Sequence, residues 1–140
     1  MSKSLEQMAL EKIRKILIAD STIKGYVSDR VYASHISSID NPVYPAISQT
    51  VIHSAPRVAV SDMVDVTIQI DLWFESGKSE VDIVLECGKK VRDLLHLQNL
   101  TDSVIGVTVG RIAEVSAGPM LFEEDTKLYH WPIRYSLVAL

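Results

Sequence analysis

The sequence is poor in the residue patterns that carry covalent, metal and phosphate chemistry. Cys87 is its only cysteine, so the chain can form neither an internal disulfide nor a zinc site with several cysteines. Such cysteine usage favours a reducing, intracellular environment. The six glycines include no dinucleotide or phosphate-binding loop, and no GxSxG nucleophile elbow occurs. The sequence therefore lacks the common enzyme motifs.

Histidines are few and scattered, with no metal-ligand spacing among His35, His53, His96 and His130. A position near an expected helix C-terminus explains His96 as a cap, and His130 is expected to point outward on the last strand. Cys87 lies inside an expected helix, which favours a small buried side chain over a nucleophile. The sequence therefore predicts no catalytic residue, no cofactor and no metal.

Excess positive charge and long apolar runs are also lacking. The formal net charge of −4 disfavours non-specific attachment to nucleic acid or to acidic membranes. The N-terminal MSKSLEQMALEK lacks the apolar stretch of a secretory signal, and no run approaches the roughly 18 apolar residues of a membrane span. Without repeats or linkers, residues 1–140 are expected to form one soluble domain.

The stretch VDVTIQIDLWFES at 64–76 shows the strongest pattern that is present, a strict alternation of apolar and other side chains. This period of two predicts a strand with one core-facing side, formed by Val64, Val66, Ile68, Ile70, Leu72 and Phe74. The other side is expected to be wet or to face a partner, and it carries Asp65, Thr67, Gln69, Asp71, Trp73 and Glu75. Trp73 favours partner contact because large aromatic side chains are enriched at interfaces.

Helical spacing appears twice. Ser4 and Gln7 fit a capping box before a helix over residues 5–19, and a short turn is expected around Gly25. A second apolar stripe predicts a helix over 80–97, with Ser79 as its cap.

The remaining segments read as strands: RVYAS, AISQTVIH at 46–53, VIGVTVGRIAEVSA at 104–117 and KLYHWPIRYSLVAL at 127–140. Pro132 in the last of these should sit at an edge or where ladder bonding lapses. Together these elements predict an α+β domain with a single sheet of 4–5 strands. The sheet is expected to be mostly antiparallel, and a mixed sheet is left open as an alternative. The two main helices of the domain are expected to pack on one face.

Two long connections between strands carry apolar side chains. SAPRVAVSDM at 54–63 contains Arg57 and Val58, and the tip at 117–126 contains Met120, Leu121 and Phe122. Apolar side chains in projecting tips favour contact with a partner, although tips folded back over their own sheet are the alternative. The consecutive acids of the second tip favour a solvated charge run over a catalytic carboxylate pair, and they are Glu123, Glu124 and Asp125.

Five segments together resemble the tail terminator, or tail completion, proteins of long-tailed bacteriophages. They are the N-terminal helix, GYVSDRVYAS, NPVYPAISQTVI, the strand VDVTIQIDLWFES running into the helix KSEVDIVLECGKKVRDLL, and the terminal KLYHWPIRYSLVAL. The resemblance spans nearly the whole chain and rests on element order, not on a catalytic signature. The polar stretch SHISSIDN at 34–41 departs from it, because it is longer than the usual connection.

Members of that family are non-enzymatic subunits that form a ring, commonly a hexamer, on the head-proximal end of the tail tube. There they stop tube polymerisation and present a surface to the head connector. The resemblance therefore implies copies of itself, the tail tube protein and the head–tail connector as partners, with DNA only in transit and no membrane. It also implies a place in the virion tail, after assembly in the host cytoplasm.

Strand alternation and loop length then suggest contacts for such a ring. Subunit interfaces are assigned to Trp73, Asp71 and Arg134, and tube or connector contacts to Arg57, Val58, Met120, Leu121 and Phe122. DNA should slide through an acidic channel without sticking, and two sets of acids are left open as its lining. One is Asp65, Asp71 and Glu75, and the other is Glu123, Glu124 and Asp125.

Two other functions remain as alternatives. The first is another neck or head-closure adaptor of the same particle, which would share size and partners but not position. The second is a small enzyme whose site shows no sequence motif.

Overall fold

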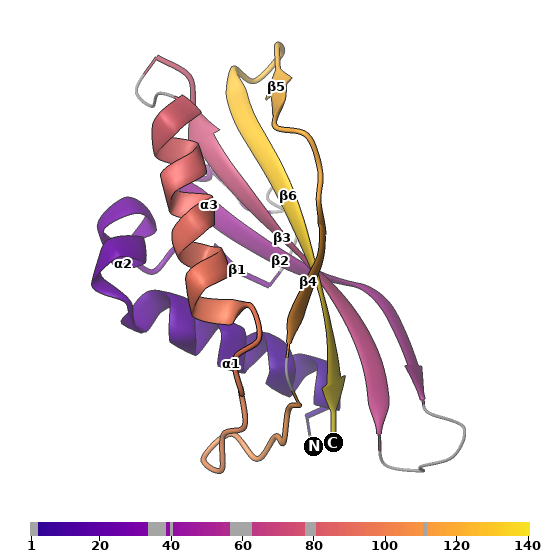
Figure 1. The fold of residues 1–140 in the computed structure, drawn as a ribbon. Coiled ribbons are helices and arrows are strands. Elements are labelled where there is room, and N and C mark those ends of the chain that lie inside the picture. Colours follow the sequence, from indigo (N-terminus) through magenta and orange to yellow (C-terminus); the bar gives the residue numbers. More distant parts are fainter. Residues whose placement is uncertain (1–2, 34–38, 40, 57–62, 78–80, 111) are drawn as a thin grey trace.

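The structure is a computed structural model that describes residues 3–33, 39, 41–56, 63–77, 81–110 and 112–140. Its helices are α1 (Leu5–Ala19), α2 (Ser21–Val27) and α3 (Val81–Leu95), and all three lie on the same face of one sheet (Figure 1). The expected helices over 5–19 and 80–97 are confirmed, the second with slightly shorter bounds. Ser79, its expected cap, lies outside the described residues.

Local capping explains where the first two helices begin. Ser4 Oγ accepts a hydrogen bond from the backbone N–H of Gln7, and Gln7 Oε1 accepts one from the backbone N–H of Ser4, so the expected capping box is present. Asp20 ends α1 and starts α2, because its carboxylate accepts from the backbone N–H groups of Thr22 and Ile23. The turn expected around Gly25 is therefore wrong, since these two bonds start a further helix.

The sheet is mixed and, in the described part of the chain, six-stranded, which exceeds the expected four to five strands. Its strands are β1 (Val31–Tyr32), β2 (Ala46–Pro56), β3 (Val64–Glu75), β4 (Ala113–Ala117), β5 (Leu121–Glu123) and β6 (Leu128–Ala139). Their order is β1-β2-β3-β6-β4, and β5 also pairs with β6. Among the described strands, only β1 runs parallel to its neighbour, which is β2. The α+β class with one mostly antiparallel sheet is thus confirmed.

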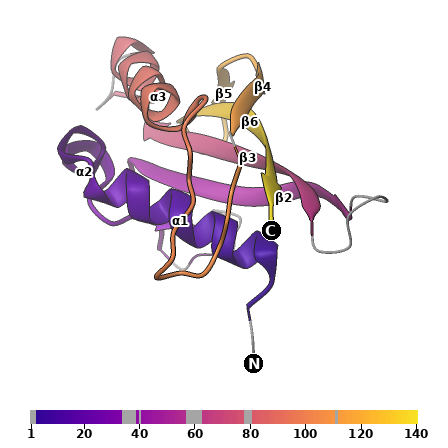
Figure 2. The same cartoon turned by 60° about the horizontal axis from the view of Figure 1, so that its bottom comes forward.

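The segment between α3 and β4 differs from the expected long strand. A strand occupies only Ala113–Ala117, and the residues before it make isolated bridges instead. This segment crosses over α1 (Figure 2), where Asp102 accepts hydrogen bonds from Lys12 and Lys15 at 2.9 and 2.8 Å. Charge therefore fixes the loop to the helical layer.

Pro132 occupies the gap between the two short strands that share one side of β6. β4 ends opposite Ile133, and β5 begins opposite His130. The carbonyl of Pro132 accepts a hydrogen bond from the N–H of Gly118 at 2.8 Å. In an antiparallel strand the nitrogen and the carbonyl of one residue point to the same side, so the nitrogen of Pro132 faces away from β3. The missing N–H therefore removes no hydrogen bond between β6 and β3. The expectation that Pro132 sits where ladder bonding lapses is confirmed.

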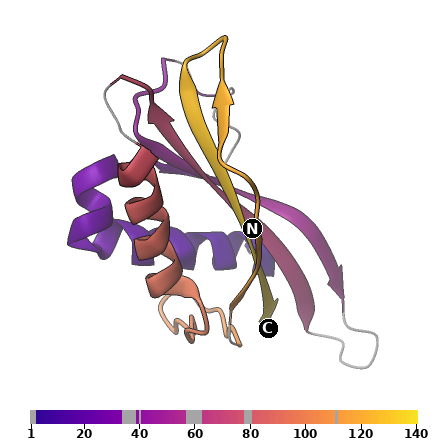
Figure 3. The same ribbon diagram turned by 45° about the horizontal axis from the view of Figure 1, so that its top comes forward.

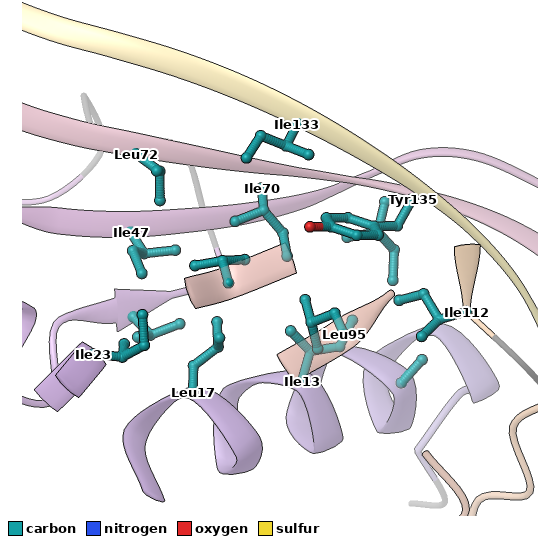
Figure 4. Packing of buried hydrophobic residues seen from close by; sticks show 14 of the residues in the cluster. Ile13, Leu17, Ile23, Ile47, Ile70, Leu72, Leu95, Ile112, Ile133 and Tyr135 are labelled. Carbon is teal, nitrogen blue, oxygen red and sulfur yellow. The ribbon is translucent and has the colours of Figure 1, made fainter. Parts of the chain in front are cut away.

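The core fills the space between the helices and the sheet (Figure 4). Ile13 and Leu17 of α1 and Leu95 of α3 point toward Ile70 and Tyr135 of the sheet. The alternation of β3 is confirmed, because its core-facing set from Val66 to Phe74 is buried and Val64 is half-buried. At roughly 25 cal/mol per Å² of apolar area, burial of these side chains is the main stabilising term.

The strands that flank the first connection end at one end of the sheet, and β5 and β6 meet at the opposite end (Figure 3). At one end Val64 pairs with both Pro56 and Ala139. At the other end Leu128 pairs with both Glu75 and Glu123.

Candidate functional site

The sheet face opposite the helices carries a polar cluster in place of an apolar core. Strand register creates it, since Ser48 of β2 pairs with Asp71 of β3, and Trp73 of β3 pairs with His130 of β6. Because side chains alternate along each strand, these four point away from the helices. We call this side the outer face.

Stacking and hydrogen bonds hold Trp73 in one orientation. Its indole lies parallel to the His130 ring, with 3.9 Å between ring centroids and 8° between planes. The indole Nε1 donates to Ser48 Oγ at 2.9 Å. Trp73 is half-buried, which suits an aromatic side chain that keeps one surface available to a partner.

Asp71 links the cluster and lies almost out of solvent, with 6% of its surface exposed. Its Oδ1 accepts from Gln69 Nε2 at 2.9 Å and lies 2.5 Å from His130 Nε2. Arg134 Nε in turn donates to Gln69 Oε1 at 3.0 Å. The structure thus brings the three expected interface residues, Trp73, Asp71 and Arg134, into one network.

Asp71 is also one of the acids expected to line the channel, and this assignment stays a prediction, although its 6% exposure leaves little surface for contact with DNA. The remaining acids of that set are far apart. Asp65 pairs with Val138 near one end of β3, and Glu75 pairs with Leu128 at the other. Leu128 also pairs with Glu123. Glu75 therefore lies in the same cross-strand row as Glu123, which belongs to the second set of acids. The two sets of acids are therefore not separate alternatives for the channel lining.

A hollow of about 520 Å³ opens on the outer face beside this cluster. Asp71, Trp73 and His130 line it together with Tyr44 and Glu123. Burial raises the pKa of Tyr44 above its ordinary value, with further contributions from the negative charges of Glu123 and Glu75. The hollow combines apolar walls with a few convergent polar groups, as binding sites do.

The second tip is part of the sheet and not a free loop. β5 pairs with β6, and the Phe122 ring lies 5.4 Å from that of Tyr129. Leu121 and Phe122 nevertheless remain 46% and 45% exposed. Met120 packs against the core, so it is less available for a partner than expected. Glu124 and Asp125 are exposed in the turn that follows.

The first tip cannot be compared in the same way, because Arg57 and Val58 lie outside the described residues. Met63, which ends that connection, is half-buried.

Cys87 and His96 have structural surroundings. Cys87 is buried in α3, as expected, and burial raises the pKa of its thiol to about 12. His96 Nδ1 accepts a hydrogen bond from the backbone N–H of Glu114 at 3.0 Å, so its ring joins α3 to β4 instead of capping the helix. Among the described residues, no three histidine, cysteine or acidic side chains gather as metal ligands, and no helix is long and apolar enough to span a membrane.

Sequence reasoning missed His130, Ser48, Gln69 and Tyr44 as members of this site. The first three could have been found by aligning the alternating patterns of β3 with those of its two neighbours, since register alone places them beside Asp71 and Trp73. Tyr44 belongs to the connection before β2, and no periodic signal places it on the hollow.

The fold recurs among solved structures. A chain in a structure titled "Virion of native gene transfer agent (GTA) particle" matches with a TM-score of 0.75 and 13% identity, over 99% of this chain and 98% of that one. At this identity the likeness shows a shared fold. No curated protein matches the chain in sequence.

A family model identifies the chain more specifically. The model described as tail completion protein gp17 matches residues 11–139. Since this match covers nearly all of the 140 residues, the chain belongs to the tail completion protein gp17 family. The resemblance to tail completion proteins seen in the sequence is confirmed.

Proposed function

We propose that the protein is a structural subunit of a ring, commonly of six copies, that caps the head-proximal end of a phage-like tail tube. In this position it stops tube polymerisation and offers a surface to the head connector. The role is structural and involves no catalysis or cofactor. The domain is a single one, assembled in the host cytoplasm and retained in the virion tail.

Family membership over residues 11–139 carries the proposal. Two features of the structure support it. The strands that lead into its two tips end at opposite ends of one sheet, which suits a subunit placed between a tube and a connector. Leu121 and Phe122 keep apolar surface exposed at one of these ends, which favours a protein partner.

Ring formation requires heterologous contacts, in which each subunit presents two different patches to its neighbours. The outer face of the sheet, with Trp73 and Arg134, is one such patch in this proposal. The proposed channel lining is the group of acids at the end of the sheet where β5 and β6 meet. These acids are Glu75, Glu123, Glu124 and Asp125. Their negative charge would keep passing DNA from binding.

Deletion of the gene from the particle tests the proposal. Without the ring, tubes should continue to grow, so electron microscopy should show tails of broad, excessive length that are not joined to heads. Re-expression of the chain should restore both length and joining. Weak contacts would leave the isolated chain monomeric and let the ring form only on the tube, so the particle is the better assay.

A different result separates the neck or head-closure alternative. Loss of such an adaptor would leave tails of normal length that fail to join heads. Normal-length tails in the deletion therefore contradict the capping function, whatever happens to head joining.

A further inference from the structure

The chain that leaves α3 pairs with the chain that enters β4. The N–H of Leu97 donates to the carbonyl of Ile112 at 2.6 Å, and the N–H of Ile112 donates to the carbonyl of Gln98 at 3.3 Å. Among the described strands, β4 is the last in the order β1-β2-β3-β6-β4, so it forms an edge of the sheet. The two backbone bonds therefore tie the end of α3 to the start of an edge strand.

His96 supplies the next acceptor along this edge. Its Nδ1 accepts a hydrogen bond from the backbone N–H of Glu114 at 3.0 Å. Backbone groups two residues apart in an extended chain point to the same side, so the N–H of Glu114 follows that of Ile112. The imidazole thus takes the place that a carbonyl of a neighbouring strand would hold, and it continues the pairing by one bond.

This bond requires one particular form of the imidazole. A ring nitrogen accepts a hydrogen bond only through its lone pair, so Nδ1 of His96 carries no proton and the neutral ring holds its proton on Nε2. A histidine that gains a second proton is a donor at both nitrogens. His96 is exposed, so protons reach it directly from solvent. Acidification therefore removes the acceptor of the Glu114 N–H.

The charged groups around His96 offer a protonated ring little in exchange. Arg92 and Asp93 of α3 and Glu114 of β4 line one hollow with it. Arg92 Nε donates to Glu114 Oε1 at 2.7 Å, and Lys89 Nζ donates to Asp93 Oδ2 at 2.9 Å. The hydrogen bond from Lys89 also lowers the pKa of Asp93 below its ordinary value. Both nearby acids therefore already have a cationic partner, and Arg92 adds a positive charge beside the ring.

We propose that His96 is a pH-sensitive clasp on the edge of the sheet. In its neutral form it holds the start of β4 to the end of α3, and in its protonated form it releases the N–H of Glu114. An edge-strand N–H without a partner is a group with which another strand can pair, so acid opens one position at this edge. The clasp lies within a single chain and does not depend on the proposed ring.

Nuclear magnetic resonance of the ¹⁵N-labelled chain measures the bond directly. Two nitrogens joined by a hydrogen bond share a scalar coupling, which is recorded here between the backbone nitrogen of Glu114 and Nδ1 of His96. Because histidine changes its charge between about pH 5 and pH 8, the coupling should be present at pH 8 and lost at pH 5. A missing coupling at pH 8 or a coupling that persists at pH 5 overturns the clasp.

The variant His96→Asn keeps an acceptor without a titratable ring, because its Oδ1 can accept where Nδ1 does and gains no proton in this range. Exchange of the Glu114 amide with water, expressed relative to its intrinsic rate at each pH, reports the protection that the bond gives. Between pH 8 and pH 5 this protection should fall several-fold in the wild type, as for one lost hydrogen bond, and should stay constant in His96→Asn.

His53→Asn is the matched control, because it removes an exposed histidine of β2, and it should follow the wild type. An equal loss of protection in His96→Asn and the wild type would place the titrating group elsewhere and overturn the clasp. The coupling in the wild type needs no variant, so it decides the question even if a substitution disturbs the fold.

Discussion

The two tryptophans lie on opposite faces of the sheet, and their surroundings differ in kind. Trp131 on the helical side is 7% exposed, lies against Gly88 of α3, and donates from Nε1 to the carbonyl of Gly118 at 2.8 Å. Trp73 on the outer face is half-buried and is held by Ser48 and His130. Close packing fixes the first, and polar contacts beside an open hollow fix the second.

Under the proposed function, this difference separates the face that supplies stability from the face that takes part in assembly. Substitutions on the helical side remove buried area or create clashes, so they should lower the free energy of unfolding. Substitutions on the outer face leave the core intact and should change contacts with partners instead. Paired substitutions on the two faces, or at the contacts that hold the helical side together, should therefore differ in effect, from the largest contrast to the smallest.

Leu72→Ala compared with Thr67→Ala gives the largest contrast, because both residues lie on β3. Leu72 is fully buried on the helical side, and Thr67 lies on the outer face. Truncation of Leu72 should cost about 3 kcal/mol of unfolding free energy, from lost transfer energy and the cavity that remains. Thr67→Ala should cost less than about 1 kcal/mol. Urea denaturation followed by circular dichroism measures both, and equal losses would contradict the assignment of the faces.

Gly88→Ala tests the close approach of α3 to Trp131. A Cβ at Gly88 would lie 2.1 Å from the Trp131 ring, so the helix or the ring must shift. We expect a net loss of about 2 kcal/mol, because the clash exceeds the helix propensity that alanine gains. Gly25→Ala in α2 meets nothing within 4 Å and should stabilise by up to about 1 kcal/mol. A thermal shift of the same sign for both variants would refute this packing.

Asp102 joins its loop to α1 through ion pairs, and its contribution to the free energy of unfolding should depend on pH. Lys15, the backbone N–H of Ile105 and Lys12 hold the pKa of its carboxyl well below the ordinary 3.8. A lowered folded-state pKa stabilises the protein above the unfolded pKa, and this stabilisation is lost as pH falls below about 4. Asp102→Asn should therefore be less stable at pH 7 and should lose less stability between pH 5 and 3.

Urea denaturation at pH 7, 5 and 3 measures this dependence. Asp125→Asn, in the exposed turn before β6, is the matched control and should follow the wild-type pH profile. If Asp102→Asn and the wild type lose equal stability on acidification, the ionic contact to α1 does not hold the loop.

Tyr135→Phe should have the smallest effect. Burial raises the pKa of Tyr135, and its hydroxyl finds no hydrogen-bond partner within the described part of the chain. Removal of an unsatisfied hydroxyl should leave stability unchanged or raise it by up to about 1 kcal/mol. Trp131→Phe removes an indole that does donate, and it should destabilise. A clear loss of stability in Tyr135→Phe would show that the hydroxyl has a partner.

Periodic patterns made most of the fold predictable. The alternation at 64–75 and the Ser4–Gln7 capping box each depend on residues close in sequence, and both are confirmed. The missed elements lack such a signal. α2 has seven residues and begins at an Asp20 cap, and β5 has three residues and pairs only because β6 lies beside it. Tertiary context decides elements of that length.

The candidate site was predictable in part. Alternation placed Asp71, Trp73 and Arg134 on the outer face, and the structure joins them in one network. Burial of Asp71 could not be predicted, because it depends on His130 from a strand 59 residues away. The hollow also needs Tyr44 from the connection before β2. Contacts between distant segments carry no local pattern.

Hydroxyl-radical footprinting of the two tryptophans tests the central claim, that the outer face is an assembly surface, most directly. Oxidation of Trp73 and Trp131 is measured by mass spectrometry in the isolated chain and in assembled tails. Trp131 should be protected in both states, while Trp73 should react in the isolated chain and become several-fold protected in tails. Equal oxidation of Trp73 in the two states would contradict the account.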